Sequence, residues 1–124
     1  MLNKRLKAPN VAFLIVLNAT YYGLEKQKAI TRYKMVRKSF MLLARRKALH
    51  STFVAEVAVE LQELGWQLIE DGSGNFCFFD MNMTTNWARL STKRVKALRD
   101  SSESELIALL EANLASEDCE ENDD

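Results

Sequence analysis

Residues 31–47 read TRYKMVRKSFMLLARRK and combine seven lysines and arginines with no acidic residue. The apolar residues recur at helical spacing, and on a helix that turns about 100° per residue they cover one side. They are Tyr33, Val36, Phe40, Leu43 and Ala44. The cations on the opposite side are Lys34, Lys38 and Arg45. We therefore predict a helix that ends near Lys47, with one face for a protein core and one face for anions.

The last cations of this stretch, Arg45, Arg46 and Lys47, also suit a helix C-terminus, because cations there meet unsatisfied backbone carbonyls. A second basic stripe is predicted further on. If residues 84–98 form a continuous helix, Arg89, Lys93 and Lys96 lie on one side of it. A break near Ser91 and Thr92 would weaken that stripe.

Apolar patterns predict three more helices, over residues 11–22, 53–64 and 102–114. The first is apolar almost all round, and its β-branched residues leave a central strand as the alternative. The last begins with Ser102 and Glu105, which have the spacing of a capping box. One β-hairpin is predicted from Trp66–Glu70 and Asn75–Phe79, because the glycines between them permit positive φ.

These elements predict a mainly α fold with one small β-hairpin, which belongs to the α+β class. The 124 residues suffice for one compact helical domain, which we assign to residues 1–115. Residues 116–124 are predicted to be a disordered tail, because six of the last eight residues are acidic.

The order of a basic helix, a turn, a second helix and a hairpin also fits a winged helix-turn-helix. The chemistry fits less well. The helix in the recognition position carries an acidic stripe of Glu56, Glu60 and Glu63, and the hairpin tip offers Asp71 in place of a cation. A face of this kind repels phosphate.

The formal net charge of zero conceals a strong polarity along the chain. Residues 1–50 hold twelve Lys and Arg and one acid, a net charge of +11. Residues 51–99 hold five and six, a net charge of −1, and residues 100–124 hold none and ten, a net charge of −10. Such asymmetry points to a polyanion partner, to an acidic tail with a role of its own, or to two ends that neutralise each other.

Enzyme chemistry has little support in the sequence. There is one histidine, His50, which we interpret as a turn residue, and there is no zinc-binding, phosphate-loop or nucleophile-elbow motif. We expect no catalytic residue, no metal and no cofactor. Cys77 and Cys119 lie far apart and predict no disulfide framework, which favours a reducing compartment.

The N-terminus imitates a signal peptide, because MLNKRLK is followed by the apolar run VAFLIVLNA. Pro9 interrupts the junction, and no convincing small-x-small cleavage site follows. The apolar residues 11–17 are too few to span a membrane. We expect a cytoplasmic protein with no membrane partner.

The sequence therefore predicts a non-enzymatic accessory or regulatory protein that binds DNA or RNA mainly through phosphates. The predicted contacts are Lys34, Lys38, Arg45, Arg46, Arg89, Lys93 and Lys96. The aromatic residues Trp66, Phe76, Phe78, Phe79 and Trp87 are predicted to cover the hairpin, and a stacking surface for single-stranded bases is the alternative.

The competing hypothesis is a small protein-interaction module, an inhibitor or adaptor of the kind that mobile elements encode. Its acidic surface, formed by Glu56, Glu60, Glu63 and the tail, would bind a basic partner protein. In that case the basic helix would serve self-association, which makes a homodimer a further alternative.

Overall fold

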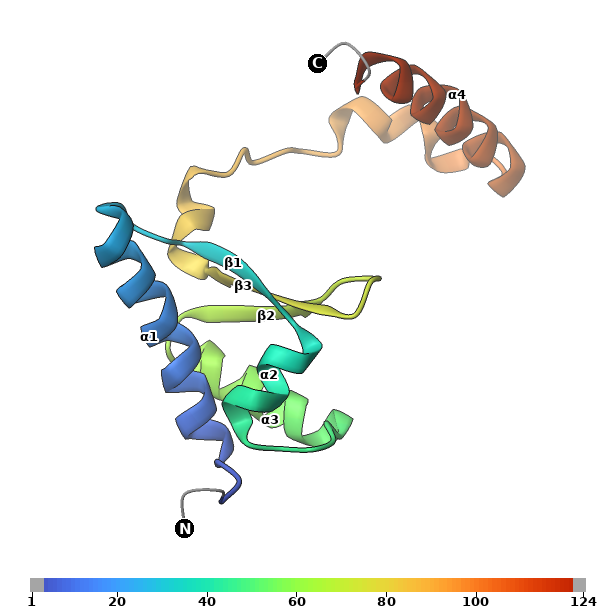
Figure 1. Cartoon of the computed structure of the whole chain (residues 1–124). Helices are drawn as coiled ribbons and strands as arrows, with labels where there is room; N and C mark the ends of the chain where they lie inside the picture. The colour runs from blue at the N-terminus through green and yellow to red at the C-terminus, as the bar shows by residue number, and fades with distance from the viewer. Residues whose placement is uncertain (1–3, 122–124) are drawn as a thin grey trace. The chain divides into compact units, whose positions relative to one another are not determined.

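The computed structural model describes the backbone of residues 4–121 and the side chains of residues 4–114. Internal packing divides the chain into two units, Met1–Trp87 and Ala88–Asp124. The first unit contains α1 (Ala8–Lys26), β1 (Arg32–Val36), α2 (Arg37–Ala44), α3 (Ser51–Glu63), β2 (Trp66–Glu70), β3 (Asn75–Asp80) and the 3₁₀ helix η1 (Met81–Asn86) (Figure 1). The second contains the 3₁₀ helix η2 (Lys93–Asp100) and α4 (Glu103–Glu121). The mostly helical α+β class is confirmed.

The helix predicted to begin between Leu24 and Thr31 and to end near Lys47 is wrong in its first half. Residues 32–36 form strand β1, and only residues 37–44 are helical. Tyr33 and Met35 pack against the core and alternate with exposed Arg32 and Lys34, which is the two-residue period of a strand. β1 pairs antiparallel with β3, so the hairpin is not the only strand pair.

The sheet has three antiparallel strands in the order β1-β3-β2, and α1, α2 and α3 lie on one of its faces (Figure 1). The helices bury Val11, Ala12, Ile15 and Ala19 from α1, Phe40 and Ala44 from α2, and Phe53, Val57 and Leu61 from α3. The sheet buries Trp66, Leu68, Phe76 and Phe78. The prediction of a core role is thus confirmed for three of the hairpin aromatics.

Tyr33 links the sheet to α1 through a hydrogen bond. Its hydroxyl donates a hydrogen bond of 2.6 Å to the backbone carbonyl of Ile15. Its ring lies 5.2 Å from that of Phe78, measured between centroids. Burial raises the pKa of Tyr33 to about 12, although a side-chain hydrogen bond with Asn18 acts in the opposite direction.

Helix α1 confirms the helix predicted over residues 11–22 and extends it at both ends. The helix continues through Gly23 to Lys26 and ends at Gln27 in the left-handed conformation. Gly23 allows the chain to pass close to the helix end. Its carbonyl accepts the Lys28 N–H at 3.0 Å, and a Cβ atom at Gly23 would lie only 2.6 Å from the Lys28 carbonyl oxygen.

The helix and hairpin predicted next are confirmed as α3, β2 and β3. Asp71 organises the hairpin turn, because its Oδ1 accepts the backbone N–H groups of Ser73 and Asn75, each at 2.9 Å. Both bonds lower the pKa of the Asp71 carboxyl, and the bond from the Asn75 N–H has the larger effect. Asp71 is therefore a turn residue, as its position in the sequence indicates.

The helix predicted over residues 84–98 is broken, which includes the alternative break near Ser91 and Thr92. Residues 87–92 are not helical and separate the 3₁₀ helix η1 of the first unit from η2 of the second. The capping interaction of the last helix is present, because the Glu105 N–H donates to the Ser102 hydroxyl at 3.2 Å. Helix α4 runs to Glu121, beyond the residue at which we placed the start of the tail. The assignments of residues 1–115 as one domain and 116–124 as a disordered tail stay predictions, and residues 122–124 lie outside the described residues.

Candidate nucleic-acid interface

The N-terminal segment is joined to the end of α2 by two hydrogen bonds. The Leu6 N–H donates to the Ala44 carbonyl at 3.0 Å, and the Arg46 Nη2 donates to the Leu6 carbonyl at 2.9 Å. Leu6 also packs against the core. The cations on either side of Leu6 are therefore held beside those of the α2–α3 turn, although about 40 residues separate the two segments.

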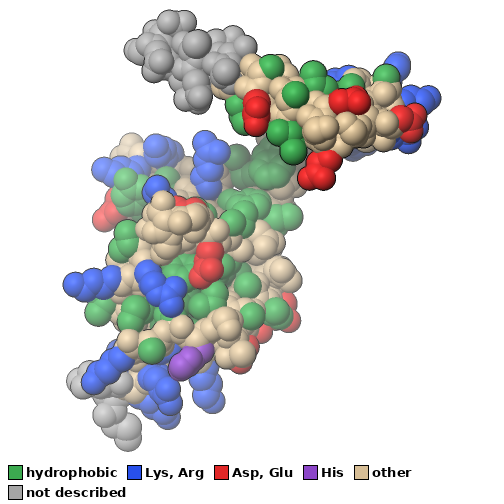
Figure 2. Space-filling model, turned by 90° about the vertical axis from the view of Figure 1, so that its right-hand side faces the viewer, with side chains coloured by type: hydrophobic (Ala, Val, Ile, Leu, Met, Phe, Trp, Pro, Cys, Tyr) green, Lys and Arg blue, Asp and Glu red, His purple; other side chains and the backbone are tan. Residues whose placement is uncertain are grey.

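We name the resulting surface the N-terminal basic cluster and define it as Lys4, Arg5, Lys7, Arg45, Lys47 and His50. Two open hollows mark it, of about 480 and 330 Å³, and Arg5 and Arg45 line both. No acidic residue lines either hollow. Figure 2 shows Lys and Arg side chains gathered at the end of the first unit that carries the histidine.

The neighbouring residues Arg45 and Arg46 differ in their surroundings, and only Arg45 belongs to the cluster. Arg45 is the left-handed residue that ends α2, with φ of 56°, and its side chain is exposed. The guanidinium carbon of Arg46 lies 3.5 Å from the centre of the Phe53 ring, so the side chain ties the turn to α3. Because Arg46 is already engaged by Phe53 and Leu6, we assign it a structural role and exclude it from the cluster.

The N-terminus of α3 adds to the positive potential of the cluster. His50 is the N-cap of this helix, and its side chain makes no capping hydrogen bond. The first turn of α3 contains no acid, so the partial positive charge of the helix end is not neutralised locally. Exposed cations beside a helix N-terminus form an environment that favours phosphate groups.

The three residues of the first predicted basic stripe do not share one face in the structure. Lys34 lies on the outer face of the sheet, opposite Cys77 of β3, whereas Lys38 lies in the first turn of α2. Arg45 joins the N-terminal basic cluster instead. The stripe depended on one continuous helix, and the change from strand to helix at Val36 removes the common face.

The second predicted stripe lies in the other unit and is only partly maintained. Arg89 lies in the non-helical segment before η2. Lys93 and Lys96 are exposed on η2, where their spacing of three residues places them on the same side of a 3₁₀ helix. Arg89 therefore does not extend a helical stripe.

The acidic stripe of α3 lies where the sequence predicts it. Val57 and Leu61 are buried, and Glu56 and Glu63 are exposed while Glu60 is half-buried. Among the described residues, no three His, Cys, Asp or Glu side chains are grouped as a metal site requires. On α3, this stripe leaves only the N-terminal end of the helix as part of the candidate interface.

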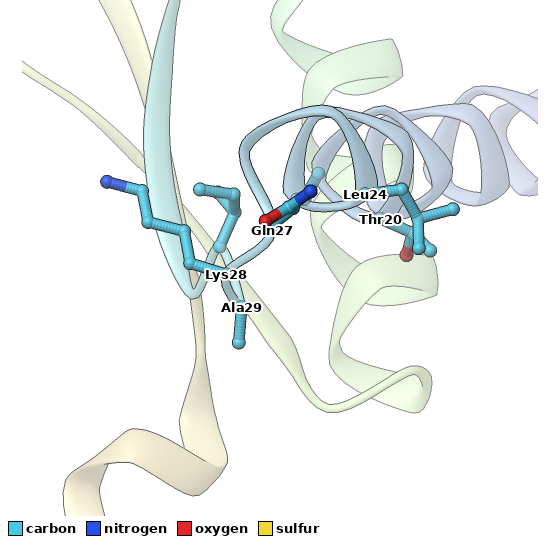
Figure 3. Close-up of a pocket in the computed structure, with 8 residues that line it drawn as sticks. Thr20, Leu24, Gln27, Lys28 and Ala29 are labelled. Atoms are coloured by element: carbon cyan, nitrogen blue, oxygen red, sulfur yellow. The ribbon is translucent and has the colours of Figure 1, made fainter.

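A separate hollow of about 490 Å³ lies at the end of α1 and is shown in Figure 3. Its walls come from Thr20, Leu24, Gln27, Lys28 and Ala29, together with Gly23 and two neighbours. Lys28 is the only ionisable residue that lines it, and Figure 3 shows that its side chain extends away from α1. The hollow lacks the convergent polar groups that a catalytic or ligand site needs.

None of the helices in the described part of the chain is both long and apolar enough to cross a membrane. Comparison with protein families, with curated protein sequences and with solved structures found no match to this chain.

Proposed function

We propose that this protein is a non-enzymatic nucleic-acid-binding accessory or regulatory protein that contacts phosphates through its N-terminal basic cluster. The observation that carries the proposal is the joining of two basic segments, residues 4–7 and 45–50, around the N-terminus of α3. Exposed Lys and Arg without neighbouring acids are the side chains that replace counterions on a phosphate backbone.

The arrangement of the first unit supports a winged helix-turn-helix. Helices α2 and α3 are joined by a short turn, the β2–β3 hairpin follows, and β1 completes a three-stranded sheet. In such a domain the second helix approaches the groove and the hairpin lies near the backbone. Here only the N-terminal end of α3 suits that position, because Glu56 and Glu63 are exposed further along the helix.

This charge distribution favours phosphate contact over base reading. A helix laid along the groove would bring its acidic stripe close to phosphates, and like charges repel most strongly where water is excluded. The hairpin tip adds no cation, because Asp71 occupies it. We therefore expect low sequence specificity and a strong dependence of affinity on salt.

Two matched double variants test the proposal. Arg5→Ala with Lys47→Ala removes two cations from the cluster, and Lys26→Ala with Lys28→Ala removes two exposed cations at the far end of α1. Fluorescence anisotropy with a labelled DNA or RNA duplex should show that the first pair reduces the slope of log affinity against log salt by about two units. The second pair should leave the slope unchanged. Equal effects of the two pairs would refute the cluster as the interface.

A second candidate function, a protein-interaction module, is favoured by helix α4. Leu106, Ile107, Leu110 and Leu114 are exposed there, at 38% to 61% of their surface, next to acidic residues. An acidic helix with exposed apolar side chains suits a basic partner that offers an apolar groove. Copurification of a basic protein that is lost with Leu110→Glu would favour this function, and light scattering would show whether the partner is a second copy.

A further inference from the structure

The face of the sheet that the helices leave uncovered carries a further hollow, of about 360 Å³. Its floor is formed by β1 and β3, and residues of η1 and the segment after it close one side. The side chains that define it are Arg32, Lys34, Cys77, Phe79, Met83 and Trp87. This volume lies within the range of roughly 300 to 1,000 Å³ that is usual for ligand pockets.

Two aromatic rings form its wall. The centroids of Phe79 and Trp87 lie 6.0 Å apart, and the ring planes are inclined by 32°. Trp87 is 62% exposed, so most of its indole surface faces solvent. The five hairpin aromatics are thereby divided, because Trp66, Phe76 and Phe78 are buried in the core and Phe79 and Trp87 remain accessible from the opposite face.

Cations lie beside these rings. Arg32 is the register partner of Phe79, and Lys34 is the partner of Cys77, so both project from the same face of the sheet as the aromatic wall. No acidic residue lines the hollow. Arg32 pairs directly with Phe79 of the aromatic wall, so it is the cation that we assign to a phosphate contact. An aromatic wall with an adjacent guanidinium suits the face of a base and the phosphate next to it.

We infer that this hollow binds an unpaired nucleobase of single-stranded nucleic acid, with the base against Trp87 and Phe79 and the neighbouring phosphate at Arg32. The site is distinct from the N-terminal basic cluster. Helix α1, which connects the two regions, has 19 residues and is therefore about 28 Å long. The start of β1 lies at the end of the first unit away from the N-terminus (Figure 1). The inference does not depend on duplex binding at the cluster.

The test compares a labelled thymidine oligonucleotide with an abasic oligomer of the same length. Wild-type protein should bind the thymidine oligomer more tightly, because only this oligomer has bases to stack. Trp87→Ala should weaken its binding by about five- to a hundredfold and leave the affinity for the abasic oligomer unchanged. Trp87→Phe, which keeps a ring, should retain most of the affinity. Because Trp87 is mostly exposed, the melting temperature of both variants should stay close to that of the wild type.

The outcomes separate this site from the proposed function. Equal affinity of wild-type protein for the two oligomers, or an unchanged affinity of Trp87→Ala for the thymidine oligomer, would overturn the inference even if duplex binding at the cluster were found. Loss of thymidine binding in Trp87→Ala with intact duplex binding would support it. If duplex binding is absent and base-dependent binding of single strands is present, the proposed function fails and this inference stands.

Discussion

Arg45 carries a charged side chain at a position where the backbone conformation is energetically unfavourable. Its φ of 56° places it in the left-handed region, where an L-residue with a side chain loses roughly 1 to 2 kcal/mol relative to the right-handed helix. Glycine is the usual residue in this position at a helix end. The position instead carries an exposed guanidinium that lines both hollows of the basic cluster.

Replacing Arg45 by Gly should therefore separate stability from binding. We expect Arg45→Gly to raise the free energy of unfolding by about 1 kcal/mol in urea titrations. We expect the same variant to bind duplex DNA or RNA more weakly. The matched control is Gln27→Gly, at the end of α1, which changes the other non-glycine residue with positive φ in the described part of the chain. It should gain similar stability with unchanged affinity. Undiminished affinity of Arg45→Gly would remove Arg45 from the interface.

Tyr33 makes a pH-dependent contribution whose sign follows from its pKa. The folded-state pKa of about 12 exceeds the ordinary value of 10.0, so the folded state favours the neutral phenol. Its contribution to stability is complete below about pH 10 and is lost as pH rises toward 12. Tyr33→Phe should thus be less stable than wild type at neutral pH, because the bond to Ile15 is lost, and the difference should shrink across this range. A difference that stays constant from pH 8 to about 12 would contradict this linkage.

At the scale of elements, local patterns predicted α3 and the β2–β3 hairpin but not β1. The hairpin strands are next to each other in sequence and are joined by a turn whose glycines mark it. Residues 32–36 satisfy both a helical and a strand period, so the pattern alone could not decide between them. Pairing with β3, far along the chain, decides the outcome, and no local window contains that information.

The candidate interface was predictable only in part for the same reason. Arg45 is among the contacts that the sequence predicts, whereas the pattern around Lys4, Arg5 and Lys7 indicates only a resemblance to a signal peptide. Their contribution depends on the bond between Leu6 and Ala44, which joins distant segments. The concentration of cations in residues 1–50 was the available signal, but it gave no positions in space.

The end of α1 offers a test of close packing between elements. A helical Gly→Ala change normally stabilises by about 1 kcal/mol. At Gly23, however, the new Cβ would lie 2.6 Å from the Lys28 carbonyl oxygen, so the backbone that leads into β1 must move. We expect Gly23→Ala to lower stability by about 1 to 3 kcal/mol in thermal or urea unfolding. Gly72→Ala is the control, because no atom lies within 4 Å of its added Cβ. A stabilised Gly23→Ala would disprove the close approach.

At the scale of the whole molecule, the two units carry net charges of opposite sign. Residues 1–87 hold twelve Lys and Arg against seven acids, a net charge of +5, and residues 88–124 hold five against ten, a net charge of −5. A chain with no net charge can therefore present one strongly basic surface. Its attraction for a polyanion is reduced at long range by the acidic unit, and salt screens both effects.

Ending the chain at Ala115 should therefore raise affinity for nucleic acid at low salt. The truncation removes Glu117, Asp118, Glu120, Glu121, Asp123 and Asp124 and changes the net charge from 0 to +6. The gain should be largest near 10 mM salt, where the Debye length is about 30 Å, and small near 150 mM, where it is about 8 Å. A fall in affinity would instead assign these acids to a partner contact.

The most direct test of the proposed function is a nuclear magnetic resonance titration of the isotopically labelled protein with a short duplex at low salt. Phosphate contact through the N-terminal basic cluster predicts that backbone amide shifts concentrate in residues 4–7 and 45–52 and return to their free values as salt is added. Amides near Glu56, Glu60 and Glu63 should move little. No shifts at low salt, or shifts confined to the acidic stripe of α3 or to α4, would contradict the account and favour a protein partner.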